Sequence, residues 1–83
     1  MKINLHPHAK ARLAERGATE AEVLATIVQG ERFPAKFGRA GFRRNFSYQS
    51  HWRGNFYATK QITAFAASEP DGWLVITLIV KYF

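Results

Sequence analysis

The hydrophobic periodicity of this chain changes near Gly30, and the change restricts the folds that the chain can adopt. Between Val23 and Val28 the apolar residues recur at helical spacing and form one stripe. Between Phe42 and Gln49 they alternate with polar residues, which is the pattern of a half-buried strand. Helical segments followed by strands indicate an α+β fold. We therefore expect two N-terminal helices packed on a three- to four-stranded antiparallel sheet.

The boundaries of the two helices follow from capping signals. Gly17 is placed to end a first helix over residues 5–16, because glycine readily adopts the left-handed conformation found at helix C-termini. Thr19 and Glu22 have the spacing of a capping box, in which each side chain accepts a hydrogen bond from the other residue's backbone amide. A second helix is therefore expected over residues 20–29.

The remainder of the chain, residues 42–83, has the composition of a sheet. Strands are expected over residues 56–67 and 73–83, joined by a turn at Glu69–Gly72 with proline in its second position and glycine in its fourth. This turn predicts an antiparallel hairpin whose last strand is apolar enough to be central in the sheet. Residues 31–41 contain a proline and two glycines and are expected to form a loop or an irregular edge.

Length and composition limit the class of protein. A chain of 83 residues, 47% of them hydrophobic, forms one domain over residues 1–83 with a single modest core. The absence of cysteine excludes disulfides, thiolate zinc sites and cysteine nucleophiles. No apolar run typical of a signal peptide follows Met1, and the longest apolar stretch, Leu74–Val80, is too short to span a bilayer. We expect a cytoplasmic protein with no membrane partner.

The charge distribution indicates a polyanionic partner. Twelve lysines and arginines stand against six acids, and no acid lies between Arg32 and Ser68. Aromatic residues interleave with the basic residues of this window, and that mixture suits a phosphate backbone with unstacked bases. RNA or an acidic protein is therefore the expected partner. The alternative is a basic surface that is simply solvated.

Three polar residues of the first helix are candidates for chemistry. His8, Arg12 and Arg16 are spaced four residues apart and form one stripe beside the apolar face. His8 is a candidate acid or base because imidazole titrates near neutrality. In the alternative, His8 packs locally and the arginines pair with Glu15 or Glu22. His6 and His8 are two residues apart and would point to different faces of a helix, so no metal site is expected.

Lys60 is the one charged residue in an otherwise apolar row of its strand. Counting from the turn at residues 69–72 places Lys60 directly opposite Lys81. Opposed like charges are destabilising, so we expect either an anion such as phosphate between the two ammonium groups or a pKa of one lysine that is lowered by the other. In the alternative, a bulge shifts the register or both lysines extend past the end of the sheet. Thr77 and Tyr82 are weaker candidates in the same region.

Two motifs resemble the bacterial domain-of-unknown-function family numbered 4258. The first is His8-x-x-x-Arg12-x-x-x-Arg16-Gly17, followed by Thr19-Glu20-x-x-Val23. The second combines Tyr57-Ala58-Thr59-Lys60-Gln61-Ile62 with the closing Val75-Ile76-Thr77 and Lys81-Tyr82. The resemblance covers both ends of the chain and fades between Arg32 and Asn55.

This family is similar to the small RelE-like ribonuclease toxins of the barnase–EndoU–colicin–RelE group. The resemblance implies helices packed on an antiparallel sheet and an acidic antitoxin or immunity protein as partner. It also implies either a free toxin or the C-terminal tip of a larger secreted protein of contact-dependent growth inhibition. Carried over residue by residue, the resemblance points to a catalytic set of His8, Arg12, Lys60, Thr77 and Tyr82.

The leading hypothesis is a metal-independent endoribonuclease without a cofactor, in which an RNA 2′-hydroxyl attacks the adjacent phosphate. His8 is the expected acid or base, and Lys60 and Arg12 are expected to bind the phosphate. Tyr82 or Tyr57 would donate a proton or stack on a base. The alternatives are a non-catalytic RNA-binding module and a protein-interaction domain. The expected RNA-binding residues are Arg16, Arg43, Arg44, Arg53, Tyr57 and Lys81.

Overall fold

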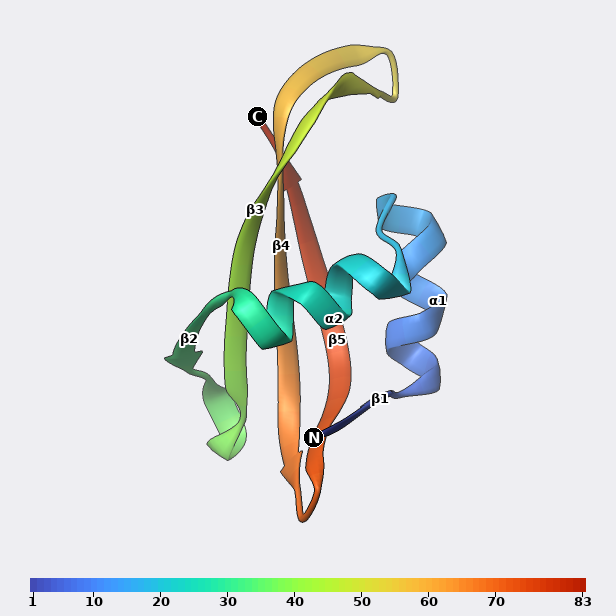
Figure 1. The fold of residues 1–83 in the computed structure, drawn as a ribbon. Coiled ribbons are helices and arrows are strands. Elements are labelled where there is room, and N and C mark those ends of the chain that lie inside the picture. The colour runs from blue at the N-terminus through green and yellow to red at the C-terminus, as the bar shows by residue number, and fades with distance from the viewer.

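Two helices and a five-stranded sheet make up the fold, which the computed structural model describes over all 83 residues. The predicted α+β class, with the N-terminal helices packed on the sheet, is confirmed. The elements in chain order, labelled in Figure 1, are β1 (Lys2–Leu5), α1 (Pro7–Arg16), α2 (Glu20–Gln29), β2 (Glu31–Pro34), the single turn η1 (Lys36–Gly38), β3 (Ala40–Trp52), β4 (Asn55–Glu69) and β5 (Gly72–Tyr82).

The sheet has the strand order β1-β5-β4-β3-β2. All neighbours pair antiparallel except β1, which pairs parallel to β5. The expected count of three or four strands is corrected to five, because β1 and β2, each 4 residues long, are too short to show an alternating pattern. The first helix begins at Pro7 and not at residue 5, because Leu5 belongs to β1 and pairs with Val75.

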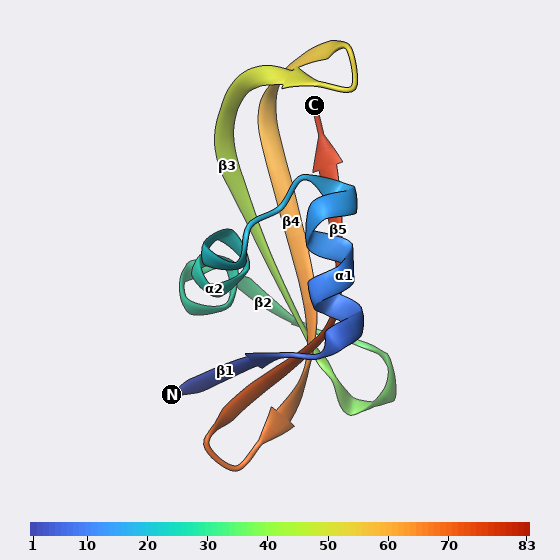
Figure 2. The same ribbon diagram turned by 90° about the vertical axis from the view of Figure 1, so that its right-hand side faces the viewer.

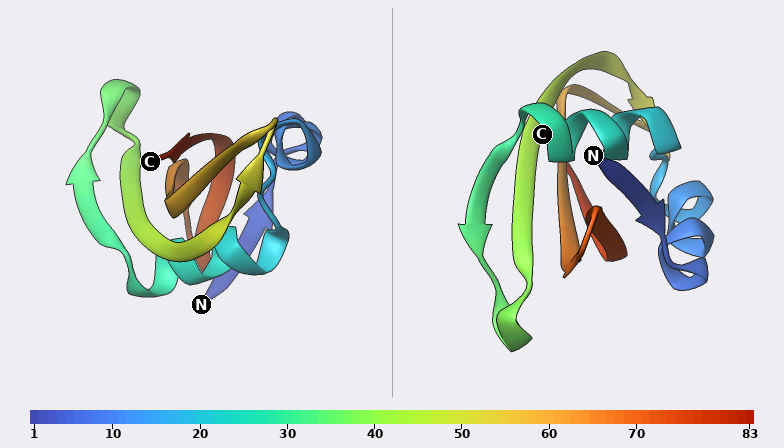
Figure 3. Two further views of the ribbon diagram at one scale, coloured as in Figure 1. Left: turned by 90° about the horizontal axis from the view of Figure 1, so that it is seen from above. Right: turned by 60° about the horizontal axis from the view of Figure 1, so that its bottom comes forward.

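One face of the sheet carries the helices and the core. The helix α1 packs along β5, and α2 crosses β3 and β4, as Figures 2 and 3 show from further directions. Alternate side chains of the central strands point toward the helices and are buried there. The core between the two layers includes Ala9, Val23, Ile27, Phe42, Ile62, Ala64 and Leu78.

The opposite face, which we call the open face, has neither α1 nor α2 over it (Figure 2). Residues opposite each other in a ladder share a face, so the register defines the rows of this surface. The rows are Gly41–Phe65–Thr77, Arg43–Thr63–Ile79 and Asn45–Gln61–Lys81.

The hairpin of β3 and β4 extends beyond the helices and curls over the end of α1 (Figures 1 and 2). A register shift between Ser47 and Ser50, with Gln49 at φ 48°, marks where the hairpin bends. Bulges increase the local twist of a strand pair. The bend brings the hairpin tip, around Trp52 and Arg53, against the C-terminal end of α1.

A second bulge corrects the predicted register of β4 and β5. The turn pairs Ser68 with Trp73, but the register shifts between Phe65 and Ala66. Beyond the shift, Lys60 lies opposite Tyr82, and Lys81 lies opposite Gln61. The expectation that Lys60 faces Lys81 is therefore wrong, and the alternative of a bulge is confirmed.

Gly17 and Gly38 allow a matched test of the contact between the hairpin tip and α1. Both have a left-handed φ, +70° and +69°, but a Cβ at Gly17 would collide with the Tyr82 hydroxyl and the Trp52 ring, whereas nothing lies within 4 Å at Gly38. Gly38→Ala should cost about 1–2 kcal/mol of unfolding free energy from backbone strain alone. Gly17→Ala should cost about 1–3 kcal/mol more from the collision. Equal losses in urea denaturation would show that the tip does not rest on α1.

Candidate functional site

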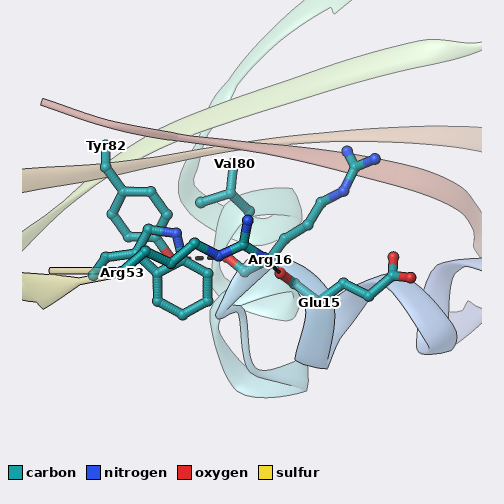
Figure 4. A pocket seen from close by; sticks show the side chains of 6 residues that line it. Glu15, Arg16, Arg53, Val80 and Tyr82 are labelled. Atoms are coloured by element: carbon teal, nitrogen blue, oxygen red, sulfur yellow. Dashed lines mark hydrogen bonds between the residues drawn. The ribbon is translucent and has the colours of Figure 1, made fainter.

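The hairpin tip, the end of α1 and the end of β5 enclose a cleft of about 430 Å³, shown in Figure 4. We call it the hairpin cleft. Each element contributes side chains because the curl of the β3–β4 hairpin lays its tip across the other two. The cleft is lined by Glu15 and Arg16 of α1, Trp52 and Arg53 of the hairpin tip, and Val80 and Tyr82 of β5.

Stacked aromatic rings form one wall of the hairpin cleft. The rings of Trp52 and Tyr82 are stacked, with centroids 5.1 Å apart and planes inclined by 17°. The rings of Tyr48 and Tyr57 also pack near the Tyr82 ring, with centroid distances of 5.2 and 5.6 Å. Aromatic side chains gathered in this way are the groups on which nucleobases stack in proteins that bind single strands.

The Tyr82 hydroxyl forms a hydrogen bond within the protein. It donates a hydrogen bond of 2.7 Å to the carbonyl of Arg16. Burial, followed by the neighbouring Tyr48 and Glu22, raises the pKa of Tyr82 to about 12. The hydroxyl is therefore a weaker acid than a free tyrosine. Near neutral pH it keeps its proton and can transfer it only to a more basic oxygen, such as a departing alkoxide.

Two arginines supply positive charge to the cleft. Arg53 Nη2 donates to the carbonyl of Glu15 at 2.9 Å, and its guanidinium lies 5.1 Å from the Trp52 ring centroid. Arg16 Nη1 donates to the carbonyl of Leu78 at 2.7 Å, on the edge of β5 beyond the end of β1. Each guanidinium has five N–H groups in a planar fork, so one hydrogen bond holds it and others remain for a phosphate.

Lys60 lies beneath the cleft and is already paired. Its ammonium donates to Glu22 Oε1 at 2.9 Å and to the carbonyl of Gly17 at 2.9 Å, lies 2.8 Å from Glu22 Oε2, and the residue is only 6% exposed. The same Glu22 carboxylate accepts from the Thr19 amide and completes the predicted capping box. The anion beside Lys60 is therefore the Glu22 carboxylate and not the expected phosphate, and the Lys60 ammonium does not line the cleft.

His8 and Arg12 lie outside the hairpin cleft. His8 is exposed in the first turn of α1, about 12 Å along the helix axis from Arg16 at 1.5 Å per residue. Arg12 forms an ion pair with Glu15, with 2.7 Å between Nη1 and Oε2. This agrees with the alternative prediction that the arginines of this helix pair with Glu15 or Glu22. The Arg12 guanidinium lowers the pKa of the Glu15 carboxyl. The predicted stripe therefore runs along α1 toward the cleft, and only Arg16 reaches it.

The remaining candidates fall on other surfaces. Arg43, Thr77 and Lys81 belong to the open face, on the side of the sheet away from the core. Arg44 lies with its guanidinium 4.8 Å from the Phe46 ring centroid and lines a separate polar hollow near Gln29. The structure thus brings together Arg16, Arg53, Tyr57 and Tyr82, but not the full predicted set.

Three residues of the cleft, Glu15, Trp52 and Val80, were not predicted as site residues. Trp52 lies just before the strand expected over residues 56–67, and a tryptophan beside an arginine at that place is a signal that could have identified it. Glu15 was considered only as a partner for an arginine. Its backbone carbonyl, which accepts from Arg53, has no signature in sequence.

No family model, curated protein or solved structure matches this chain. No group of three or more histidine, cysteine, aspartate or glutamate side chains is arranged to hold a metal ion. Neither helix has the length and apolar character needed to cross a membrane.

Lys60→Met should destabilise the protein, because it leaves the Glu22 carboxylate and the Gly17 carbonyl without their donor. Breaking a buried pair costs about 3–5 kcal/mol, and the partial exposure of Glu22 places the expected loss toward the lower value. Lys81→Met on the exposed open face is the matched control and should change stability by less than about 0.5 kcal/mol. Adding Glu22→Gln to Lys60→Met should recover part of the loss in urea denaturation. An unchanged midpoint for Lys60→Met would contradict the structural role.

The raised pKa of Tyr82 predicts a loss of stability in alkali. The folded protein favours the neutral phenol, so this contribution is complete below the ordinary pKa of 10.0 and disappears as the pH rises through about 12. Tyr82→Phe should flatten the fall in unfolding free energy between these two values. Absorbance titration of tyrosinate should show one late-titrating group that Tyr82→Phe removes, and its persistence in the variant would assign the shift to another tyrosine.

Proposed function

We propose that this protein is a metal-independent endoribonuclease that binds single-stranded RNA in the hairpin cleft. The observation that carries the proposal is the meeting of Arg16, Arg53, a stacked Trp52–Tyr82 pair and a protonated tyrosine hydroxyl in one cleft. Cations fit the phosphate, rings fit an unstacked base, and the hydroxyl fits the leaving oxygen. The resemblance of the sequence to RelE-like ribonucleases agrees with this chemistry.

The proposed reaction forms a bond between the RNA 2′-oxygen and the adjacent phosphorus and breaks the bond from phosphorus to the 5′-oxygen. Glu15, the one acidic residue that lines the cleft, is the proposed base. Its carboxylate has to leave the ion pair with Arg12 before it accepts the proton of the 2′-hydroxyl. Tyr82 turns from the Arg16 carbonyl and gives its proton to the departing 5′-oxygen. The products are a 2′,3′-cyclic phosphate and a 5′-hydroxyl.

Charge stabilisation is the larger part of this proposal. A carboxylate with a lowered pKa, as in Glu15, is a weak base, so proton removal alone supplies limited acceleration. Arg16 and Arg53 are held by backbone carbonyls and need little reorganisation to meet the charged transition state. His8 and Arg12, farther along α1, are assigned to phosphates that flank the scissile one.

The proposed partner besides RNA is an acidic antitoxin or immunity protein, and the proposed place of action is the cytoplasm. Both follow from the resemblance and from the acid-free window between Arg32 and Ser68. A basic surface without acids associates rapidly with an acidic protein. Toxicity on expression, relieved by a small acidic protein, would support this partner.

A non-catalytic RNA-binding module is the second candidate. Two observations favour it: Lys60 is neutralised by Glu22, and His8 lies outside the cleft. Both observations remove a group that the sequence hypothesis gave to catalysis. RNA that binds tightly but remains intact after long incubation with the purified protein would decide for this module.

Tyr82→Phe should lower kcat/KM for RNA cleavage about 10²- to 10⁴-fold, the range typical of a lost general acid. Tyr57→Phe is the matched control, because Tyr57 touches the Tyr82 ring without a hydroxyl hydrogen bond within the protein, and it should retain near-normal activity. Circular dichroism and the thermal midpoint should confirm that both variants fold. Full cleavage by folded Tyr82→Phe would remove Tyr82 from the mechanism.

A further inference from the structure

We propose that the open face carries a second RNA-binding site, which holds a single-stranded segment outside the hairpin cleft. The site is a groove of about 660 Å³ beside η1, called here the η1 groove. The proposal rests on the proposed function only in naming RNA as the ligand. The residues that argue for it are Phe33, Lys36, Phe37, Arg39, Phe65 and Thr77.

Phe37 presents an aromatic ring to solvent. It is 86% exposed and has a left-handed φ of 61°, which bulky residues rarely adopt. Burial therefore does not explain a phenylalanine at this strained position. The Arg39 guanidinium lies 5.6 Å from the ring centroid. An exposed ring with a cation beside it is the arrangement on which single-stranded nucleic acids stack.

The floor of the η1 groove is also aromatic. The Phe33 ring lies across Gly41, where a Cβ would collide with it, and meets Phe65 edge-on at 6.3 Å. The Arg43 guanidinium lies 4.6 Å from the Phe33 centroid on the same face. The missing side chain of Gly41 leaves the space that the Phe33 ring occupies, and Phe33 and Phe65 both line the groove.

Charge selects among the ligands that an aromatic groove can take. Lys36 and Arg39 line the groove, and no acid does. On β2, Glu31 lies at the far end of the strand and opposite Arg43. A purely apolar ligand would leave these cations unused, whereas an RNA strand uses both the rings and the charges. Thr77, predicted as catalytic, lies in this groove and is reassigned here to RNA binding.

The two sites lie far apart on the molecule. The hairpin tip and η1 stand at opposite ends of its long axis in Figure 1, and the protein extends 41 Å in that direction. Arg43 and Lys81 lie between them on the open face. A short oligonucleotide can therefore fill only one site, whereas a long strand can reach both.

The test separates the two sites by oligonucleotide length. Affinity is measured with 2′-O-methyl RNA of about 16 nucleotides, which cannot be cleaved by 2′-hydroxyl attack, and cleavage with RNA of about 4 nucleotides. Phe37→Asn removes the ring but keeps a residue that tolerates a left-handed φ, so the fold should be retained. Val28→Ala, an exposed apolar residue on α2, is the control.

Phe37→Asn should weaken binding of the long analogue about tenfold and leave cleavage of the short RNA unchanged. Arg39→Ala should reduce the magnitude of the slope of log affinity against log salt concentration by about 1, the value expected for the loss of one phosphate contact. Unchanged long-RNA affinity with normal short-RNA cleavage would overturn the η1 groove and leave the proposed function standing. Weakened binding by Phe37→Asn in a protein that cleaves no RNA would support the groove and overturn the nuclease. A change from dimer to monomer, without any effect on RNA affinity, would make the groove a contact between copies.

Discussion

The ion pair of Lys60 and Glu22 connects all three parts of the fold. Lys60 belongs to β4 and is only 6% exposed, so its ammonium is largely shielded from water. The ammonium donates hydrogen bonds to the Gly17 carbonyl and to the Glu22 carboxylate. Glu22 in turn caps α2 through the Thr19 amide. One side chain of the sheet thus fixes where α1 ends and where α2 begins. No buried side-chain polar atom remains without a partner, so the polar network beneath the helices is complete.

The hairpin cleft depends on this junction. The last carbonyls of a helix lack partners within the helix, and here the sheet supplies donors to two adjacent positions. Lys60 donates to Gly17, and Tyr82, its neighbour across the ladder, donates to Arg16. A positive charge near a helix C-terminus is also favoured by the helix dipole. The end of α1 is therefore rigid, and Trp52 can pack on Gly17 only because that glycine has no side chain.

The fold could be predicted because its helix ends and turn depend on neighbouring residues. The site could not be predicted because its contacts join residues far apart in the sequence. Gly17, the Thr19–Glu22 capping box and the turn at residues 69–72 depend on a few neighbouring residues, and all three form as predicted. The alternation of β4 correctly marked Lys60 as unusual, yet its partner is 38 residues away. A bulge of one residue, for which the apolar run of β5 gives no sign, then exchanged Lys81 for Tyr82 opposite Lys60.

The basic residues between Arg32 and Ser68, a segment without acids, do not form one continuous basic surface in the folded protein. Successive residues of a strand point to opposite faces, so Arg43 and Arg44 lie over different rings, those of Phe33 and Phe46, although both line the polar hollow near Gln29. The curl of the hairpin moves Arg53 to a third place, against α1. A polyanion meeting this protein therefore encounters basic groups on distinct surfaces, each with its own aromatic partner. Salt dependence of binding reports the sum of these contacts, and the aromatic rings, which lie at Trp52 and at Phe37, distinguish one surface from another.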